Sequence, residues 1–423
     1  MAHLAVRKHE RNAPDDRIDW RKVAYLVQLS RALDEMEEKR LVPEKKVLYQ
    51  FSARGHDMAQ ILLGTQLTGL HDATCGYYRS RPLLLSLGVD PVDALGSAMG
   101  RAGGYSDGRD IGVVFNYPNL SGASALPMCG GVGAQYTPTA GWAQAMKYYA
   151  TTLGRQDYAR DIGVVLGGDG SVASNGFWAA LTAVTTQALP MLFYIEDNGF
   201  GISVPSTVQT PGGNIAANLA SWKNLAIFDG DGCNPAEAAN LIQDAVSFVR
   251  EERKPALLRL TVPRLEGHSF QDTQTYKSEE TVRREWERDP LPRLRDFLVP
   301  AVMTVQEWDA CESDARRMAE SARIAAEERP VADPSSVTRH VFFDGDMQTM
   351  GGQYPMGYAQ RATTTEAETS GARINMVTAI RKTLEHEMSI NERGVIFGED
   401  VGPKGGDVAG GVRHAGCGIL ARQ

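Results

Sequence analysis

The segment GGDGSVASNG, at residues 167–176, combines four glycines with a single carboxylate, that of Asp169. Glycines let a backbone approach a phosphate closely and adopt positive φ angles. The unpaired N–H groups at the start of a following helix also favour anions. We therefore expect this loop to bind a ligand that carries a diphosphate.

The carboxylate of Asp169 would repel an unshielded diphosphate at such short range. A metal cation between the two groups removes this conflict. Asn198 follows 29 positions later, in the turn DNGFG. Its amide oxygen, the Asp169 carboxylate, one loop carbonyl, two phosphate oxygens and a water make the octahedral oxygen shell that magnesium prefers. The two residues therefore predict a magnesium–diphosphate site.

A second class of cofactor fits part of the same loop. Gly168-x-Gly170-x-x-Ala173 matches the dinucleotide-binding pattern, and Glu196 or Asp197 could hold a ribose hydroxyl. A nicotinamide- or flavin-dependent oxidoreductase is thus an alternative, although it leaves the carboxylate inside the loop unexplained. A non-catalytic subunit that binds a cofactor without turnover is a further alternative.

The elements around the loop predict how these groups meet. DIGVVL (residues 161–166) reads as a strand before the loop, FWAALTAVTTQ as a helix after it, and MLFYIED (residues 191–197) as a second strand. A strand–helix–strand order is typical of parallel sheets, whose ligands bind at the carboxyl ends of the strands. We expect an α/β fold in which a parallel sheet is flanked by helices.

The chain divides into three parts by pattern. Residues 1–330 combine this region with amphipathic and charge-rich outer helices, and we expect them to form the ligand-binding domain. Residues 331–372 are rich in Pro, Ser, Thr, Gly and Gln without periodicity, which predicts a linker. Helical periodicity resumes in residues 373–423, where we expect the incomplete, truncated start of a second α/β domain.

Composition excludes several functions. The 423 residues carry a formal net charge of −8, which argues against a nucleic-acid partner because phosphate binding needs clustered Lys and Arg. No apolar run approaches the roughly 20 residues of a membrane span. The five cysteines form no CxxC pair and read as reduced thiols, so we expect a cytoplasmic protein without a nucleic-acid or membrane partner.

Three segments together resemble a known family. GDG (residues 168–170), paired with the asparagine 29 positions after its aspartate, resembles the thiamine diphosphate signature. GYYRSRPLLLSLG and RLEGHS resemble the Tyr-Arg segment and the His-bearing loop of the decarboxylating first component of 2-oxoacid dehydrogenases, in its α subunit. This resemblance covers residues 20–300, and residues 374–403 resemble the start of the β subunit, which some relatives fuse to the α subunit.

The resemblance implies a set of site residues. Asp169 and Asn198 would hold magnesium, with the main-chain carbonyl of Phe200 as the third protein ligand. His268 is the candidate catalytic residue and would close over the diphosphate. The residues implied to bind thiamine diphosphate, with Leu126 behind its aminopyrimidine ring, are Tyr78, Arg79, Leu126, Gly168, Gly170, Ser171, Arg264 and His268.

The resemblance also implies an activity and its partners. The cofactor would attack the keto carbon of a 2-oxoacid of pyruvate or branched-chain type and accept the electrons released with carbon dioxide. The acyl group would pass to a lipoyl-bearing acyltransferase. In this family a glutamate of the β part activates the cofactor, and no residue of this chain matches it. We expect the chain alone to be inactive until a β-type subunit, or a second copy, completes the site.

Three further positions carry weaker expectations. Many relatives have an arginine where this chain has Glu196, which removes one cationic contact to the diphosphate. His56 is expected to cap or pack a helix start rather than to take part in chemistry. Cys129 is expected to be a small buried residue.

Overall fold

The computed structural model describes residues 13–109, 115–339, 341–342, 373–391 and 395–396. Contacts divide the chain into two units, residues 1–337 and residues 338–423, and each is described by itself. Within the described ranges, no helix combines the length and the apolar character that a membrane crossing requires.

Six strands of the described chain form one sheet, in the order β2-β1-β3-β4-β8-β7, and all neighbouring strands are parallel. A separate antiparallel pair, β5-β6, follows the end of β4. The strands are β1 (Ala73–Cys75), β2 (Ser124–Ala125), β3 (Gly163–Gly168), β4 (Met191–Asp197), β5 (Phe200–Gly201), β6 (Val204–Pro205), β7 (Ala226–Asp231) and β8 (Ala256–Thr261).

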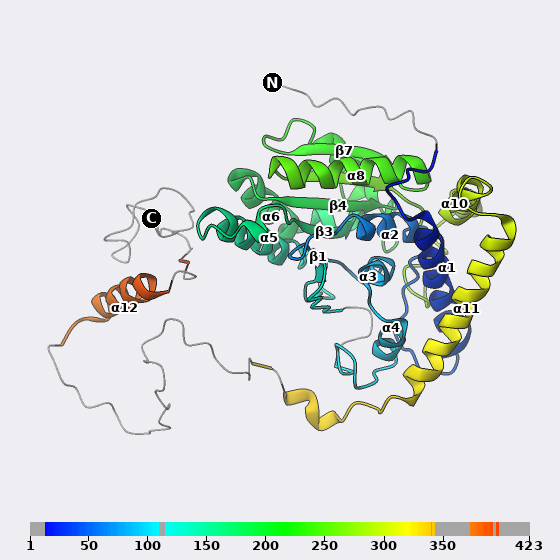
Figure 1. Ribbon diagram of the computed structural model, residues 1–423, viewed down its shortest axis with the longest axis horizontal. Helices are drawn as coiled ribbons and strands as arrows, with labels where there is room; N and C mark the ends of the chain where they lie inside the picture. The colour runs from blue at the N-terminus through cyan, green and yellow to red at the C-terminus, as the bar shows by residue number, and fades with distance from the viewer. Residues whose placement is uncertain (1–12, 110–114, 340, 343–372, 392–394, 397–423) are drawn as a thin grey trace. The chain divides into compact units, whose positions relative to one another are not determined.

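Helices surround this sheet, and the expected α/β fold with a parallel sheet between helices is confirmed (Figure 1). The helices of the first unit are α1 (Trp20–Met36), α2 (Asp57–Thr65), α3 (Arg81–Leu87), α4 (Pro91–Ala98), α5 (Tyr136–Thr151), α6 (Asn175–Gln187), α7 (Ile215–Asn218), α8 (Pro235–Glu252), α9 (Glu279–Trp286), α10 (Pro290–Leu298) and α11 (Val305–Glu328).

Two apolar clusters cover the two faces of the sheet, because successive side chains of a strand point to opposite faces. One face packs with α1, α2 and α8 through Val164, Leu166, Leu192, Tyr194 and Leu258. The other packs with α5, α6 and α7 through Val165, Phe193, Ile195 and Leu257. Both faces of β3 and β4 are therefore buried, which fixes the positions of the strand ends.

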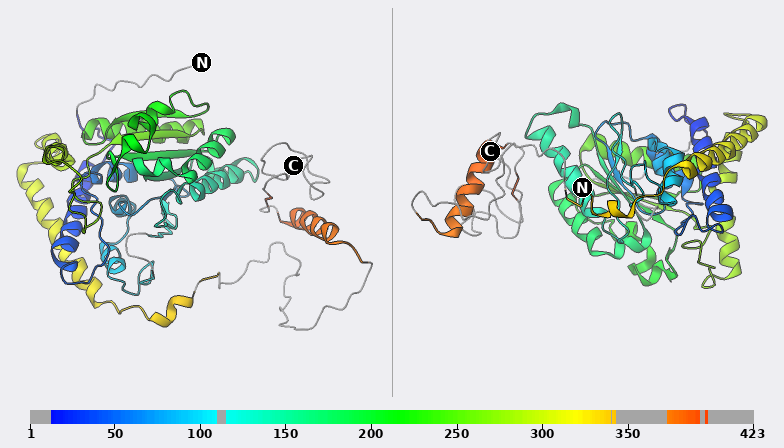
Figure 2. Two further views of the ribbon diagram at one scale, coloured as in Figure 1. Left: turned by 180° about the vertical axis from the view of Figure 1, so that it is seen from behind. Right: turned by 90° about the horizontal axis from the view of Figure 1, so that it is seen from below.

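The longest helix, α11, lies alongside α1 at the side of the sheet (Figure 1; Figure 2). It begins with a capping box, in which the Thr304 side chain and Glu307 satisfy each other's backbone N–H groups. Helix α8 begins at Pro235 and is capped by the side chain of Asn234. These helix starts agree with the sequence pattern, and so does the placement of charged helices in an outer layer.

The first helix changes its geometry near its end. The apolar periodicity of residues 20–40 is typical of one amphipathic helix, but α1 ends at Met36 and a π-helical turn, Glu37–Leu41, continues it. Such turns are rare and are often found at functional sites. The turn brings the Glu37 side chain into the protein interior, where it is fully buried.

The second unit contains α12 (Met376–Ile390), capped by the side chain of Asn375. None of the residues of α12 is buried. The expected linker is described only through residue 342, and most of the expected second α/β domain lies outside the described residues. Both stay predictions.

Candidate active site

A cavity of about 500 Å³ opens at the carboxyl ends of β3 and β4. Gly168 and Glu196 are register partners at these ends, so the residues that follow them lie side by side. Asp169 starts a 3₁₀ turn, Asp169–Ala173, directly after β3, and Asn198 follows β4. Both line the cavity together with Phe200, as the sequence predicts for neighbouring strand ends.

Asp169 is buried without a partner. Its side chain is 4% exposed, and neither carboxylate oxygen has a hydrogen-bond partner among the described residues. Burial and the nearby charge of Asp197 together raise the pKa of Asp169 to about 7. An unpaired buried carboxylate is costly, so a cation bound beside Asp169 would stabilise the folded protein.

The donors at this point suit a hard cation such as magnesium rather than a soft metal. The described residues contain no group of three or more His, Cys, Asp or Glu side chains that could hold a metal ion. A site at Asp169 would therefore rely on one carboxylate, the amide of Asn198 and main-chain carbonyls, which is an all-oxygen set. That set fits the ligands expected from the sequence.

Two buried arginines face the same cavity. Arg79 donates to the carbonyls of Ser52 and His268, both at 2.7 Å. Arg264 donates to the carbonyl of Ile202 at 2.9 Å and to the hydroxyl of Tyr276. Within the described part of the chain, neither guanidinium bonds to a carboxylate, and Nε of Arg264 has no partner. Their charges thus remain available to an anion.

His268 lies between these arginines, with Nδ1 3.5 Å from Nη2 of Arg79. Burial and the charges of Arg79 and Arg264 together lower the pKa of His268 to about 4. The imidazole is therefore neutral at neutral pH in the ligand-free protein. Its ring packs edge-on against Tyr78 at a centroid distance of 5.4 Å, so Tyr78, Arg79, Arg264 and His268 form one wall.

The turn of the Gly-rich loop lines the cavity, whereas the helix that follows it does not. Gly168, Gly170 and Ser171 line the cavity. Helix α6 begins only at Asn175, and the hydroxyl of Ser174 caps it at the N–H of Phe177. No residue of α6 lines the cavity. Ser174 satisfies one N–H group at this end, and the expectation that unpaired N–H groups of the helix face the phosphate stays a prediction.

A tight approach explains Gly170. A Cβ at this position would lie 3.2 Å from Cα of Gly201 and 3.1 Å from Oε1 of Gln209. The loop after β3 thus packs closely against β5, the segment that carries Phe200. A side chain would push apart the two segments that carry the expected metal ligands.

The two acidic residues before Asn198 point away from the cavity. Glu196 is fully buried and accepts hydrogen bonds from Gln60 and from the hydroxyl of Tyr77, at 2.9 Å and 2.7 Å. Asp197 pairs with Arg259 at 2.7 Å. Neither carboxylate lines the cavity, so the acidic pair does not face the expected position of the diphosphate.

Sequence reasoning missed one residue that lines the cavity and one that contacts an expected metal ligand. His56 stands at the N-cap position of α2 and packs there fully buried, as expected, without a side-chain cap bond; its Nε2 also lies 3.4 Å from Nδ2 of Asn198. Cys129 is exposed and lines the cavity with Gly130 to Val132. Leu126, three residues earlier in this loop, does not line it. The His56 contact joins residues 142 positions apart, which no local pattern indicates.

The fold and site together define a class: a parallel α/β protein whose sheet edge offers an unpaired carboxylate to a cation and two unpaired guanidiniums to an anion. A family model described as "Dehydrogenase E1 component" matches residues 25–335. The chain belongs to this family, as the resemblance of its α-type segments predicts.

The chain is similar to curated α-type relatives over much of their length. It is 28% identical over 274 residues to the pyruvate dehydrogenase E1 component subunit alpha of Rickettsia conorii, covering 64% of this chain and 80% of the relative. The protein of the same name from Zymomonas mobilis is 26% identical over 281 residues, covering 66% and 75%. The mitochondrial protein of Solanum tuberosum is 27% identical over 280 residues, covering 63% and 66%.

Proposed function

We propose that this chain is the α-type part of a 2-oxoacid dehydrogenase that binds thiamine diphosphate through magnesium and decarboxylates a 2-oxoacid of pyruvate or branched-chain type. The names of these relatives support the class of reaction. The finer assignments rest on the residues of the cavity.

The observation that carries the proposal is the unpaired charge in the cavity. The buried Asp169 carboxylate has no partner, while the buried Arg79 and Arg264 use only neutral oxygen acceptors. A magnesium diphosphate presents a cation to the first group and phosphate oxygens to the other two. A single ligand of this kind neutralises all three charges, which a free anion or a free cation does not do.

Each residue then has a stated role. Asp169, Asn198 and the carbonyl of Phe200 would hold magnesium, and Arg79 and Arg264 would bind the diphosphate. When bound, thiamine diphosphate supplies the electron sink that stabilises the carbanion left by decarboxylation. His268 stands beside both arginines and would donate to the phosphate or to the substrate once protonated.

The geometry disfavours the dinucleotide alternative. That reading needs Glu196 or Asp197 free to bind a ribose hydroxyl. Glu196 is instead held by Gln60 and Tyr77, and Asp197 by Arg259. The helix that should receive the pyrophosphate is capped by Ser174. Neither of the two acidic residues that this pattern requires is thus free to bind the ribose.

The proposal includes a second protein component. Asp169 is the only carboxylate among the described residues that line the cavity, and it is committed to the metal. An acid that protonates the aminopyrimidine ring must therefore come from elsewhere, and a β-type subunit or a second copy would supply it. The acyl group would pass to a lipoyl-bearing acyltransferase. The resemblance of residues 374–403 to the start of a β subunit belongs to the same proposal.

Thermal unfolding with added ligands tests the proposal. We expect thiamine diphosphate with Mg²⁺ to raise the melting temperature of the full chain, because a ligand that binds only the folded state stabilises it. Thiamine diphosphate with a chelator, and NAD with or without Mg²⁺, should leave the melting temperature unchanged. Stabilisation by NAD alone would instead support the oxidoreductase alternative.

A further inference from the structure

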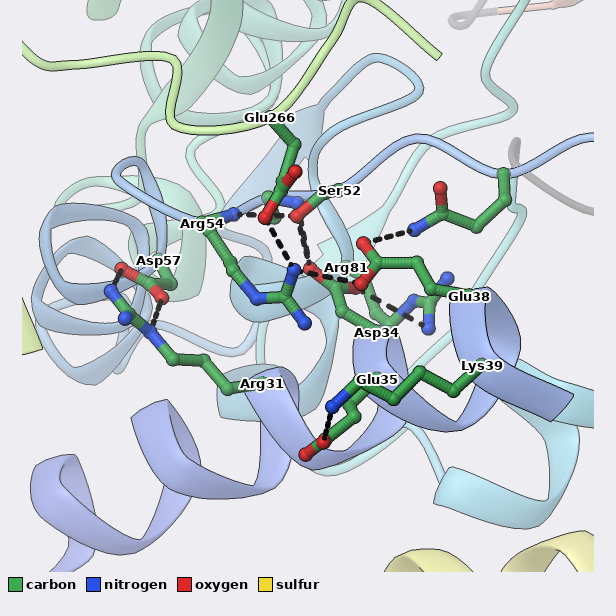
Figure 3. A network of polar contacts seen from close by, with 12 residues as sticks. Arg31, Asp34, Glu35, Glu38, Lys39, Ser52, Arg54, Asp57, Arg81 and Glu266 are labelled. Atoms are coloured by element: carbon green, nitrogen blue, oxygen red, sulfur yellow. Dashed lines mark hydrogen bonds and ion pairs between the residues drawn. The ribbon is translucent and has the colours of Figure 1, made fainter. Parts of the chain in front are cut away.

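A buried carboxylate outside the cavity organises one of its walls. Asp34, on α1, is 1% exposed and does not line the cavity. One of its oxygens, Oδ2, accepts hydrogen bonds from the hydroxyl of Ser52 and from the backbone N–H of Ala53, both at 2.9 Å. Figure 3 shows Asp34 pointing from α1 toward Ser52. The Asp34 carboxylate thus holds Ser52 and Ala53, which lie nearly twenty residues after Asp34 in the sequence.

The segment of residues 50–54 has no helical or strand structure of its own. Side chains from neighbouring elements set its path instead. Ser52 and Ala53 bond to Asp34, as described above. Arg54 pairs with Glu38 at 2.7 Å and with Glu266 at 2.8 Å (Figure 3). The carbonyl of Gln50 accepts a hydrogen bond from Phe270 at 3.1 Å. The segment is therefore held between the end of α1 and the loop that carries His268.

This segment positions the guanidinium of Arg79. The carbonyl of Ser52 accepts from Nη1 of Arg79 at 2.7 Å. The ring of Phe51 lies 6.0 Å from the Arg79 guanidinium carbon. Since no carboxylate of the described residues bonds to Arg79, the Ser52 carbonyl is one of only two oxygens, with that of His268, that orient it.

The same cluster also holds the backbone beside Arg79. Arg81, two residues further on, pairs with Glu37 at 2.5 Å, and its Nη1 lies 3.7 Å from Oδ1 of Asp34. Glu37 stands in the π-helical turn after α1. Asp34 thus contacts Ser52, whose carbonyl accepts from Arg79. Glu37 and Asp34 also contact Arg81, two residues after Arg79.

We propose that Asp34 is a positioning residue for anion binding: it holds Ser52 so that the Ser52 carbonyl orients Arg79 toward the diphosphate. The inference rests on the proposed function, because it takes Arg79 as a diphosphate contact. A carboxylate suits this role, since one of its oxygens can accept from the hydroxyl and the N–H together. Pre-orienting a charged donor raises affinity by reducing the ordering that binding requires.

Calorimetric binding of thiamine diphosphate with Mg²⁺ to the full chain tests the inference. Asp34→Ala should weaken binding about tenfold, whereas Asp34→Asn, which keeps an oxygen acceptor, should stay within about twofold. Glu35→Gln, on the neighbouring half-buried position of α1, where the carboxylate pairs with Lys39 and Arg316 rather than with Ser52, is the matched control and should bind as the unaltered chain does. Ser52→Ala, which removes only the hydroxyl, should weaken binding less than Asp34→Ala does. It tests the same contact if Asp34→Ala does not fold.

Double substitutions separate positioning from a general effect on the fold. Arg79→Lys and Arg264→Lys each keep a charge but lose the planar fork. If Asp34 acts through Arg79, Asp34→Ala should add little to the loss caused by Arg79→Lys, but its effect should multiply with that of Arg264→Lys. If Asp34 only supports the fold, the affinity loss caused by Asp34→Ala should multiply with the loss caused by either lysine variant.

The outcomes are distinct. The positioning role is overturned if the unaltered chain binds thiamine diphosphate and both variants, Asp34→Ala and Ser52→Ala, bind it as tightly as the unaltered chain. The proposed function would then still stand. Equal multiplication of the Asp34→Ala effect with both lysine variants also overturns it. Absence of binding in the unaltered chain would overturn the proposed function, and this inference with it.

Discussion

Asp169, Arg79 and Arg264 bring charge into one cavity without pairing with any carboxylate or cation of the described chain. Several other buried charges of the described chain are paired with opposite charges: Arg31, for example, bonds to Asp57 at 2.7 Å and to Asp289 at 2.5 Å. Because an unpaired buried charge destabilises the folded state, the three charges in the cavity mark a place where a ligand of mixed charge is expected.

His268 provides a pH-dependent signal of binding. Its pKa, about 4 in the ligand-free protein, lies below its usual value because burial and the two arginines disfavour the charged form. A diphosphate that neutralises these arginines should raise this pKa. Histidine NMR of the labelled chain, with His268→Gln to assign the resonance, should show a pKa below 5 without ligand and an upward shift with thiamine diphosphate and Mg²⁺.

The direction of the associated stability change follows from the lowered pKa. The unfolded chain binds a proton at His268 near the ordinary pH of 6.5, and the folded chain only near 4. This residue therefore reduces the stability of the ligand-free protein as pH falls from 6.5 to 4, and has no such effect above 6.5. An unchanged pKa on ligand binding would remove His268 from the diphosphate site.

His56 is expected to orient the side-chain amide of Asn198, the proposed metal ligand. Oδ1 of Asn198 accepts from the N–H of Phe200, so Nδ2 faces Nε2 of His56, which must then accept. Nδ1 of His56 carries the proton toward Glu196, at 3.5 Å. The buried Glu196 thereby fixes the histidine tautomer.

Two matched substitutions test this role of His56. His56→Gln places an oxygen near the position of Nε2 and should keep magnesium-dependent cofactor binding within a few-fold. His56→Asn retains only the inner half of the ring and should lose about tenfold, as is typical for a partner of a metal ligand. The measurement is calorimetry with Mg²⁺, and equal affinity in the two variants would contradict the assignment.

Sequence alone predicts the residues at the site whose positions depend on local chemistry. Asp169 and Asn198 stand directly after two apolar runs, so strand order alone brings them together. His56 could not be found in this way, because its contact depends on how α2 packs against β4. Cys129 was expected to be buried, but the glycines around it form an exposed wall of the cavity.

At the scale of elements, β3, β4 and the caps of α8 and α11 follow from sequence patterns, because hydrophobic alternation and capping residues act locally. The π-helical turn after α1 does not. Its register depends on Glu37 reaching Arg81, in a helix more than forty positions away. The N-cap role of Ser174 at the start of α6 was not predicted, because this serine lies within the Gly-rich loop.

The end of α6 offers a test of element stability. Ala188 is its C-cap and adopts a left-handed conformation, with φ 49° and ψ 60°. A side chain with a Cβ pays a steric cost there that glycine avoids. Ala188→Gly should raise the free energy of unfolding by about 0.5–1 kcal/mol, measured by urea denaturation. Ala188→Val, the control, should lower it, and a stability loss in Ala188→Gly would show that this cap is not strained.

At the scale of the whole molecule, we predict that the purified chain alone does not decarboxylate 2-oxoacids. Asp169 is the only carboxylate among the described cavity-lining residues, and the metal would occupy it. Without a further acid, activation of the cofactor should fail. Carbon dioxide release from pyruvate and from branched-chain 2-oxoacids should be absent with the chain alone and should appear when a β-type subunit is added. Release by the chain alone would place the acid within it.

The most direct test of the central claim is calorimetric titration of the full chain with thiamine diphosphate, in Mg²⁺ and in a chelator, beside Asp169→Asn. We predict saturable binding that requires Mg²⁺ and is lost in Asp169→Asn, because this substitution removes the only charged ligand proposed for the metal. That variant should melt no lower than the unaltered ligand-free chain, since it removes an unpaired buried charge. Equal affinity with and without Mg²⁺, or unchanged affinity in Asp169→Asn, would contradict the claim that this cavity holds a magnesium diphosphate.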